Sequence, residues 1–330
     1  MNWLVTGAAG FIGTNLCIRL LKAGESVTAI DDLSRKGSEK NAAHLATEFG
    51  LRVNRIDISR TDTVVEFLQK IAHPHVIAHL AGQVSFMSSI SNPRRDFEIN
   101  ALGTLNLLEF VRVISPETVL IAMSSNKIYG DLAHVRFNEG PTRYVAPDWP
   151  NGFDESVPIQ FHGPYGCSKG AVDQYVADYG RIYGLKVASF RQSSVYGPFQ
   201  HPLSDQGWVG YLVSEALSRS SIKLNGVGKQ VRDLLHVDDL ATLFLRLPHC
   251  ISQSSYQQFN VGGGMSNALS ILELFDWLEP RIGHKVEFEC GQVRPSDQKV
   301  FVADNSRISE LTGWHPSITL DEGLKELIEV

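Results

Sequence analysis

Residues 2–13, NWLVTGAAGFIG, decide the fold of this chain. The stretch opens with a short apolar run and then places glycines at positions 7, 10 and 13, where an amphipathic segment starts. Gly7 permits a tight turn, Gly10 lets the main chain approach a pyrophosphate, and Gly13 allows the next helix to pack closely on the strand. The free N–H groups at the start of that helix, beginning with Phe11 and Ile12, would face the anion. The stretch therefore predicts a strand, a phosphate-binding turn and a helix.

An acidic pair, Asp31 and Asp32, ends the next apolar run, Ser26–Ile30. A carboxylate at this place accepts hydrogen bonds from an adenosine ribose, so the turn is predicted to bind a dinucleotide rather than to be an ordinary glycine-rich turn. Asp31 would repel a 2′-phosphate, which favours NAD over NADP. Arg35 and Lys36 could pair with such a phosphate and are the argument for NADP.

The ends of later predicted strands supply further candidates for cofactor contacts. Asp57 and Ile58 follow the third strand, where they would face the adenine. Leu80, Ala81 and Gly82 follow the fourth strand, and small residues are needed where a main chain approaches a dinucleotide. Tight packing alone would also explain the small residues, and the two interpretations are compatible.

Strand-like and helix-like segments alternate through the first half of the chain. The predicted strands are Trp3–Thr6, Ser26–Ile30, Arg52–Ile56, Val76–Leu80, Val119–Met123 and Lys186–Phe190, and the predicted helices are Phe11–Ala23, Thr61–Ile71, Pro93–Val113 and Pro164–Tyr183. This alternation predicts an α/β fold with a Rossmann-type doubly wound parallel sheet. After residue 190 the alternation breaks down, so we expect a dinucleotide-binding domain over 1–190 and a smaller C-terminal α/β substrate-binding lobe over 191–330. The segment near 235–260 is a candidate for return to the first domain.

The composition limits the class of protein. The 330 residues carry 30 Lys+Arg against 36 Asp+Glu, a net charge of −6, with no basic tract, which disfavours nucleic acid as a partner. The four cysteines stand far apart without a CxxC pair, so neither a disulfide framework nor a zinc site is expected, and no other metal site is predicted. No targeting segment and no apolar stretch of about 20 residues is visible, which predicts a cytoplasmic protein without membrane insertion.

Tyr165 and Lys169 are the candidate catalytic pair. They stand four residues apart on a predicted helix and so share one face. The ammonium, together with the positive charge of an oxidised nicotinamide, would lower the pKa of the phenol from about 10. Ser125 ends the fifth predicted strand and can hydrogen-bond the same substrate hydroxyl, so the three residues could remove a proton from an alcohol as hydride leaves its carbon. A Tyr and a Lys at this spacing also occur by chance on solvated helix faces.

These features resemble the extended short-chain dehydrogenase/reductase family of nucleotide-sugar epimerases and dehydratases, and the resemblance covers essentially the whole chain. Longer runs are similar to the CDP-paratose 2-epimerase (CDP-tyvelose epimerase) branch of that family: LSRKG (33–37), HLAGQV (79–84), DFEIN (96–100), SSNKIYGD (124–131), PNGFDES (150–156), DQGWVG (205–210) and GKQVRD (228–233). One departure is Ser125, which stands where that branch has threonine. The hydroxyl remains, so its role is expected to remain.

The resemblance implies NAD-dependent epimerisation of a nucleotide-diphosphate sugar, with CDP-paratose converted to CDP-tyvelose at carbon 2, as in O-antigen biosynthesis. The sugar would be oxidised transiently to a ketone and hydride would return to its other face. Two alternatives stay open, namely a nucleotide-sugar 4-epimerase of the UDP-glucose type and a non-catalytic NAD-binding sensor. Related dehydratases carry Thr-Asp-Glu where this chain has Ser125, Asn126 and Lys127, which disfavours elimination of water because neither Asn nor Lys can replace the carboxyl groups.

The resemblance also implies site residues and an assembly. Asn100 joins Tyr165 and Lys169 among the cofactor-binding candidates. Arg232 and Arg294 match arginines that hold the diphosphate, although each could instead pair with a neighbouring aspartate. The remaining sugar-site candidates are Gln83, Asn126, His162, Arg191 and Gln206. The helices predicted over 93–113 and 164–183 could form an intersubunit four-helix bundle, so we expect a homodimer or a homotetramer.

Overall fold

A seven-stranded parallel sheet forms the centre of the computed structural model, which describes residues 1–204, 206–251, 256–294 and 296–329. The strand order is β12-β8-β5-β4-β1-β2-β3. The strands are β1 (Asn2–Thr6), β2 (Ser26–Asp31), β3 (Val53–Arg55), β4 (Val76–His79), β5 (Val119–Met123), β8 (Val187–Gln192) and β12 (Tyr256–Val261). Each neighbouring pair is parallel, so the predicted Rossmann-type fold is confirmed.

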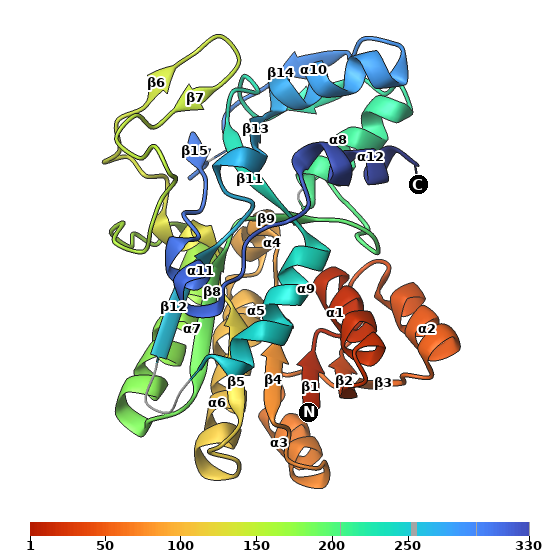
Figure 1. Cartoon of the computed structure of the whole chain (residues 1–330), viewed down its shortest axis with the longest axis vertical. Helices are drawn as coiled ribbons and strands as arrows, with labels where there is room; N and C mark the ends of the chain where they lie inside the picture. Colours follow the sequence, from red (N-terminus) through yellow and green to blue (C-terminus); the bar gives the residue numbers. More distant parts are fainter. Residues whose placement is uncertain (205, 252–255, 295, 330) are drawn as a thin grey trace.

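Helices cover both faces of this sheet (Figure 1). One face packs on α1 (Phe11–Lys22), α2 (Ser38–Phe49), α9 (Val237–Arg246) and α11 (Ser306–Thr312). The other face packs on α3 (Thr61–Lys70), α6 (Gly103–Val113) and α7 (Gly163–Tyr183). Burial on both sides explains why β5 is an unbroken apolar run, VLIAM, in which every residue is buried.

The strand order reverses between β1 and β4, since β1 pairs with β2 on one side and with β4 on the other. At such a switch point the connections leave the sheet in opposite directions and open a crevice at the carboxyl ends of the strands. The glycine turn after β1 lies at this crevice, which is where a ligand is expected to bind.

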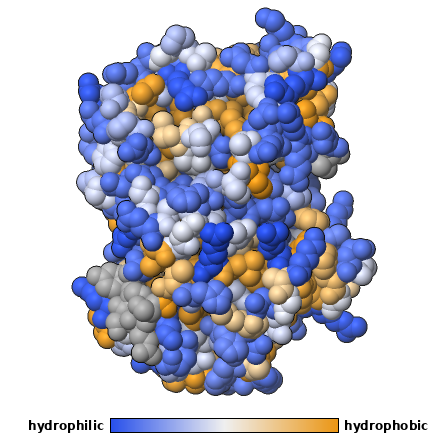
Figure 2. Space-filling view, viewed as in Figure 1, coloured by the Kyte–Doolittle hydropathy of each residue, from blue (hydrophilic) through white to orange (hydrophobic). Residues whose placement is uncertain are grey.

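The second lobe lies over the carboxyl ends of the strands (Figure 1). It contains a four-stranded sheet of β9 (Ser194–Tyr196), β11 (Val231–His236), β13 (Ala268–Ser270) and β15 (Val300–Phe301), and a strand pair of β10 (Ile222–Leu224) and β14 (Phe288–Cys290). The helices α8 (Trp208–Leu217), α10 (Ile271–Ile282) and α12 (Leu320–Glu329) enclose its apolar core. In the space-filling view, hydrophilic side chains cover most of this face of the molecule and apolar side chains gather in patches on both lobes (Figure 2).

The two lobes are not consecutive in the chain. Strand β12 extends the main sheet beside β8, and α9 packs in the same core as α1, so these two elements of the later chain lie with the first lobe. Conversely, Tyr129 and Phe153, from the long connection after β5, pack against Phe301 of the second lobe. This connection also carries a small hairpin, β6 (Asn138–Glu139) and β7 (Tyr144–Val145). A single boundary at residue 190 therefore does not describe how the lobes are built.

Four further helical elements complete the described part of the chain before residue 130. They are α4 (Phe86–Ser91), α5 (Pro93–Phe97), a π-helical turn (Glu98–Leu102) that joins α5 to α6, and a 3₁₀ turn (Asn126–Tyr129) that follows β5. Within the described residues, no helix combines the length and apolarity needed to cross a bilayer, and no cluster of three metal-ligating side chains is found.

Candidate active site

Two pockets flank the glycine turn. We call the smaller one, about 230 Å³, the strand-edge pocket, because carboxyl ends of the sheet strands line it. Of the predicted residues it contains Gly7, Asp31, Asp32, Asp57, Ile58, Leu80, Ala81, Gly82 and Gln83. We call the larger one, about 430 Å³, the interlobe pocket. It contains Phe11, Ile12, Ser125, Asn126, Tyr165, Gln206, Arg232 and Arg294.

The glycine turn leaves no room for side chains. Gly7 has a φ of +68°, and a Cβ there would lie 2.6 Å from the main-chain nitrogen of Ala81. A Cβ on Gly13 would lie 2.0 Å from the carbonyl oxygen of Gly7. Helix α1 starts after Gly10, which offers no side-chain cap to its first N–H groups. The turn is therefore a bare main-chain cradle at a helix start, which is the structure that a pyrophosphate requires.

Asp31 holds this cradle in place. Its Oδ2 accepts a hydrogen bond from the main chain of Ala9 at 3.1 Å, and its Oδ1 accepts one from Leu33 at 2.8 Å. Burial raises the pKa of the Asp31 carboxyl, against the lowering effect of these hydrogen bonds. Each carboxylate oxygen has a second lone pair that a ribose hydroxyl can use. The cradle, the carboxylate and the pocket between them fit NAD.

The catalytic candidates meet beside Phe11 and Ile12. Ser125 caps the 3₁₀ turn after β5, and its hydroxyl lines the interlobe pocket together with the phenol of Tyr165, which is in the first turn of α7. Lys169 lies one turn further along α7 and is 5% exposed. Its Nζ donates to the Met123 carbonyl at 3.0 Å, at the end of β5. The structure therefore places the phenol in the interlobe pocket and the ammonium behind it.

The pKa values of the pair describe the protein without the nicotinamide charge, which the expectation of a lowered tyrosine pKa also included. In the protein alone, burial raises the pKa of Tyr165 to about 12, although the Ser125 hydrogen bond acts in the opposite direction. Burial also lowers the pKa of Lys169 to about 8, against the attraction of Asp96. Removal from water disfavours the charged form of both groups. The positive charge of an oxidised nicotinamide beside the phenol would act in the opposite direction to burial and lower this pKa.

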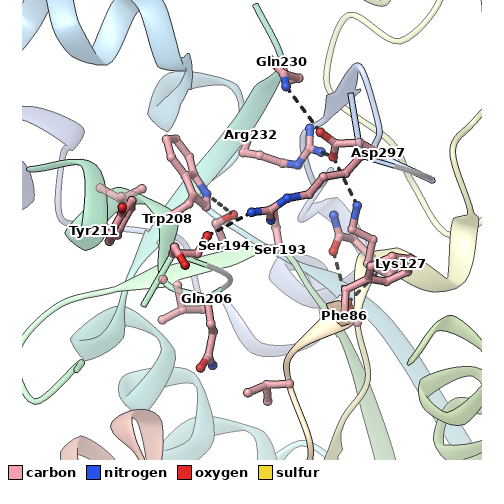
Figure 3. A pocket seen from close by; sticks show the side chains of 18 of the residues that line it. Phe86, Lys127, Ser193, Ser194, Gln206, Trp208, Tyr211, Gln230, Arg232 and Asp297 are labelled. Atoms are coloured by element: carbon pink, nitrogen blue, oxygen red, sulfur yellow. Dashed lines mark hydrogen bonds and ion pairs between the residues drawn. The ribbon is translucent and has the colours of Figure 1, made fainter. Parts of the chain in front are cut away.

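Cations gather at the second-lobe side of the interlobe pocket (Figure 3). Arg232 on β11 lies 2.8 Å from Oδ1 of Asp297, and Lys127 lies 3.5 Å from the same oxygen. Arg294 donates to the carbonyl of Ser204 at 3.0 Å. Although burial raises the pKa of Asp297, Arg232 and Lys127 together bring it below its usual value. Arg232 is thus paired with an aspartate, but with Asp297 rather than with its sequence neighbour.

Six of the predicted residues line neither pocket. Gly10 and Gly13 shape the turn, and Lys169 is buried with its Nζ on the Met123 carbonyl. The side chain of Asn100 bonds the main chain of Gln83 and the hydroxyl of Ser168. His162 precedes α7, 3.8 Å from Asp131.

Arg191 corrects the sequence interpretation. It is 3% exposed and pairs with Asp173 of α7 at 2.8 Å, and its Nη1 donates to the Tyr129 hydroxyl at 2.9 Å. These contacts join β8, α7 and the 3₁₀ turn inside the protein. Arg191 is therefore a structural residue and not part of the sugar site. The sequence does not tell which side of the sheet this side chain faces.

Sequence analysis missed several residues of the interlobe pocket. Gln192 ends β8 and Ser193 and Ser194 come directly after it, so the strand-end rule applied to Ser125 could have found them. Gln200, Trp208, Tyr211, Asn225, Gln230 and Asp297 carry no such local signal. The buried side-chain oxygens of Gln192, Gln200 and Gln230 accept no hydrogen bond from the described residues. Three unpartnered acceptors around one pocket suit a ligand rich in hydroxyl or amino donors.

Comparison with known proteins agrees with this geometry. The NAD dependent epimerase/dehydratase family matches residues 3–262. A CDP-paratose 2-epimerase of Salmonella typhi is 42% identical over 334 residues, covering 100% of this chain and 98% of the relative. A UDP-glucose 4-epimerase of Mycolicibacterium smegmatis is 32% identical over 331 residues, with 100% and 98% coverage.

Solved structures match along the whole chain as well. A UDP-glucose 4-epimerase from Thermotoga maritima, solved with UDP-glucose, has a TM-score of 0.82 at 28% identity and covers 100% of this chain and 98% of its own. A UDP-glucuronic acid 4-epimerase from Bacillus cereus, solved with UDP-glucuronic acid and NAD, has a TM-score of 0.84 at 26% identity with the same coverage. This chain therefore belongs to the NAD dependent epimerase/dehydratase family, and NAD is its cofactor.

Proposed function

We propose that this protein is an isomerase that converts CDP-paratose to CDP-tyvelose by inverting carbon 2 of the sugar. One observation carries the chemistry: the Tyr165 phenol and the Ser125 hydroxyl line the same pocket as the arginines Arg232 and Arg294. The 42% identity to the Salmonella typhi CDP-paratose 2-epimerase supports the choice of substrate.

The pocket argues against elimination of water. Among the described residues that line the interlobe pocket, Asp297 is the one carboxylate, and it is held by Arg232, Lys127 and Gln230. Asn126 stands at the place of a dehydratase acid, with its Nδ2 donating to Gln298 at 2.9 Å. An amide cannot exchange a proton with the sugar. An epimerase needs no such acid, because its only proton transfer is at the hydroxyl that is oxidised.

NAD supplies the hydride acceptor, and its oxidised ring adds a positive charge beside the phenol. Tyr165 takes the proton of the sugar hydroxyl as the carbon is oxidised and returns it when the carbon is reduced. Ser125 positions that hydroxyl, and Lys169 holds the end of β5 against α7 through its bond to Met123. Asp31 and the glycine turn hold the adenosine half. Arg232 and Arg294 bind the diphosphate while the sugar turns its other face.

The direct test is incubation of the purified protein with CDP-paratose, followed by NMR of the sugar. We expect CDP-tyvelose to appear without added NAD if the cofactor co-purifies, and on adding NAD otherwise. Mass spectrometry of the denatured protein identifies the bound dinucleotide. If CDP-paratose remains unchanged while another nucleotide sugar is converted, the substrate assignment is wrong.

A UDP-glucose 4-epimerase is the second candidate. It is favoured by the 32% identity to the Mycolicibacterium smegmatis enzyme and by the fold of the Thermotoga maritima enzyme solved with UDP-glucose. The same NMR assay with UDP-glucose separates the two, because a 4-epimerase yields UDP-galactose. Production of UDP-galactose at a rate above that of CDP-tyvelose would favour this second assignment.

A further inference from the structure

Lys127 occupies a position that the reaction described above does not use. It belongs to the 3₁₀ turn Asn126–Tyr129, two residues after Ser125, and it lines the interlobe pocket. Its main-chain N–H donates to the Ser125 hydroxyl at 3.2 Å. The lysine is therefore fixed relative to the catalytic hydroxyl by its own main chain.

The other end of the same side chain reaches the cations of the second lobe. Nζ of Lys127 and Nη2 of Arg232 approach the same oxygen, Oδ1 of Asp297, at 3.5 and 2.8 Å. Nζ also donates to the Ser296 carbonyl at 3.4 Å. Figure 3 shows Lys127 and Arg232 reaching Asp297 from different elements. Lys127 thus spans the distance between the catalytic hydroxyls and the arginine expected to bind the diphosphate.

The pocket carries more positive charge than Asp297 can balance. Its described lining includes the cations Lys127, Lys223, Arg232 and Arg294 against that single carboxylate. Burial lowers the pKa of Lys127 to about 8, and Arg232 adds to the effect. A phosphate placed among these cations would relieve their repulsion, since opposite charges within a few ångströms favour each other's ionised forms.

The structure of a nucleotide sugar indicates which of its two phosphates would lie among these cations. Carbon 1 of a nucleotide sugar carries the diphosphate, and carbon 2 is bonded directly to carbon 1. Carbon 4 lies across the ring. An enzyme that oxidises carbon 2 must therefore hold the sugar-linked phosphate close to its catalytic phenol, whereas a 4-epimerase separates the two by the width of the ring.

We infer that the Lys127 ammonium binds the sugar-linked phosphate and thereby places carbon 2, rather than carbon 4, against Tyr165 and Ser125. The contact between Lys127 and the phosphate is inferred from the cations that line the interlobe pocket. The choice of carbon 2 over carbon 4 rests on the proposed function. Lys127 then determines which carbon of the sugar is oxidised. Its ion pair with Asp297 keeps the ammonium in position when no substrate is bound.

The first experiment measures binding of CDP and CMP by calorimetry, which needs no turnover, with UDP and UMP run in parallel. Lys127→Met is expected to weaken CDP binding about tenfold and to leave CMP binding nearly unchanged, because CMP lacks the second phosphate. Lys186→Met is the matched control. Lys186 has a similar side-chain exposure, 22% against 24%, and an ion pair with Glu117 at 2.9 Å, and it does not line either pocket. Equal weakening of CDP and CMP would contradict a contact with the sugar-linked phosphate.

A double variant separates this role from a structural one. If Lys127 served only to neutralise Asp297, then Lys127→Met/Asp297→Asn would regain CDP binding, and the inference would be overturned. We expect the double variant to remain weak, and Lys127→Arg to bind CDP within about threefold of the unaltered protein because the charge is kept.

Turnover of CDP-paratose tests the choice of carbon. We expect Lys127→Met to lower kcat about 100-fold even at saturating substrate, because a bound but misplaced sugar reacts poorly. A rise in KM with unchanged kcat would overturn the placement of carbon 2. If the unaltered protein fails to convert CDP-paratose, the proposed substrate is wrong, and the CDP and CMP comparison still decides the phosphate contact.

Discussion

The guanidinium of Arg191 and the carboxylate of Asp173 form an ion pair of 2.8 Å in which the side chains are 4% and 0% exposed. Asp173 also accepts hydrogen bonds from Ser189 at 2.7 Å and from Gln258 at 2.6 Å. The carboxylate thereby joins α7 to β8 and β12. A charge buried in this way is stable only while its partner is present.

Replacing Arg191 should therefore affect stability before catalysis. We expect Arg191→Met to lower the free energy of unfolding by about 3–5 kcal/mol, because it leaves the Asp173 charge buried without its cation. Chemical denaturation measures the effect. Arg136→Met is the control, since Arg136 pairs with Asp148 at 2.6 Å on the surface, with side chains 64% and 55% exposed. Its denaturation midpoint should stay nearly unchanged. Comparable stability of both variants would show that the buried pair is not needed.

The phenol of Tyr165 should be required for the chemical step and not for cofactor binding. We expect Tyr165→Phe to reduce kcat by about 10²–10⁴-fold, the usual contribution of a positioned acid or base. The amount of NAD bound should not change, because the strand-edge pocket and the glycine turn stay intact. The measurement is epimerase turnover together with the dinucleotide content of the purified variant. A variant with unaltered turnover would exclude Tyr165 as the proton acceptor.

The glycine turn can be tested with a matched pair of glycines. Gly7 and Gly50 have nearly the same φ, +68° and +66°, but nothing lies within 4 Å of a Cβ on Gly50. Both alanine variants should lose about 1–2 kcal/mol of stability through backbone strain. Only Gly7→Ala should also lose NAD binding, because its Cβ would displace the main chain of Ala81 from the cradle. Titration of the two alanine variants with NAD, followed by fluorescence or calorimetry, distinguishes them. Equal NAD affinity in both variants would contradict the role of the glycine turn in binding the cofactor.

Lys169 should make stability depend on pH in a defined direction. Its pKa is about 8 in the folded protein, below the usual value of about 10.4 for an unfolded chain. Between these values the unfolded state binds more protons, so stability rises with pH in that range. Lys169→Met lacks this contribution. We expect the stability of the unaltered protein relative to Lys169→Met to increase by about 1–3 kcal/mol between pH 7 and pH 10.

Denaturation curves of both proteins at several pH values give this difference directly. The remaining titratable groups are common to the two proteins and cancel in the comparison. A difference that stays constant, or that falls as pH rises, would show that the Lys169 ammonium is not destabilised by burial.

An exposed apolar face predicts self-association. Phe97 of α5 is 57% exposed, and Tyr175 and Ile182, seven residues apart on one side of α7, are 47% and 60% exposed. Large apolar side chains gathered on neighbouring helices usually mark an interface. We expect a dimer or tetramer by light scattering at micromolar concentration. Ile182→Glu should shift it toward the monomer, whereas Met265→Glu on the second lobe, at a residue 48% exposed, should not. A monomeric unaltered protein would contradict this interface.

Much of the first lobe could be predicted because its signals are local. The six predicted strands were found within two residues of their bounds, and the predicted helix over 93–113 is present as α5, the π-helical turn and α6. Helix α2 was missed because its segment, SEKNAAHLATEF, is polar and turns only three of its residues, Ser38, Asn41 and Leu45, fully into the protein. The edge strand β12 was missed as well, since its sequence, YQQFNV, carries three amide side chains and lacks the apolar run that marked the other strands.

What the sequence alone determined was the set of features whose partners lie within a few residues of one another. These are the glycine turn with its following helix, the acidic end of β2, and the spacing of Tyr165 and Lys169 on one helix face. Tertiary structure decided which distant side chains meet. It placed Arg191 against Asp173 rather than in the pocket, and it brought Lys127 and Arg232 to one oxygen of Asp297, 170 and 65 residues away along the chain. The physical reason is that helices, turns and strand ends follow from short-range geometry, whereas ion pairs and pocket walls depend on how separate elements pack.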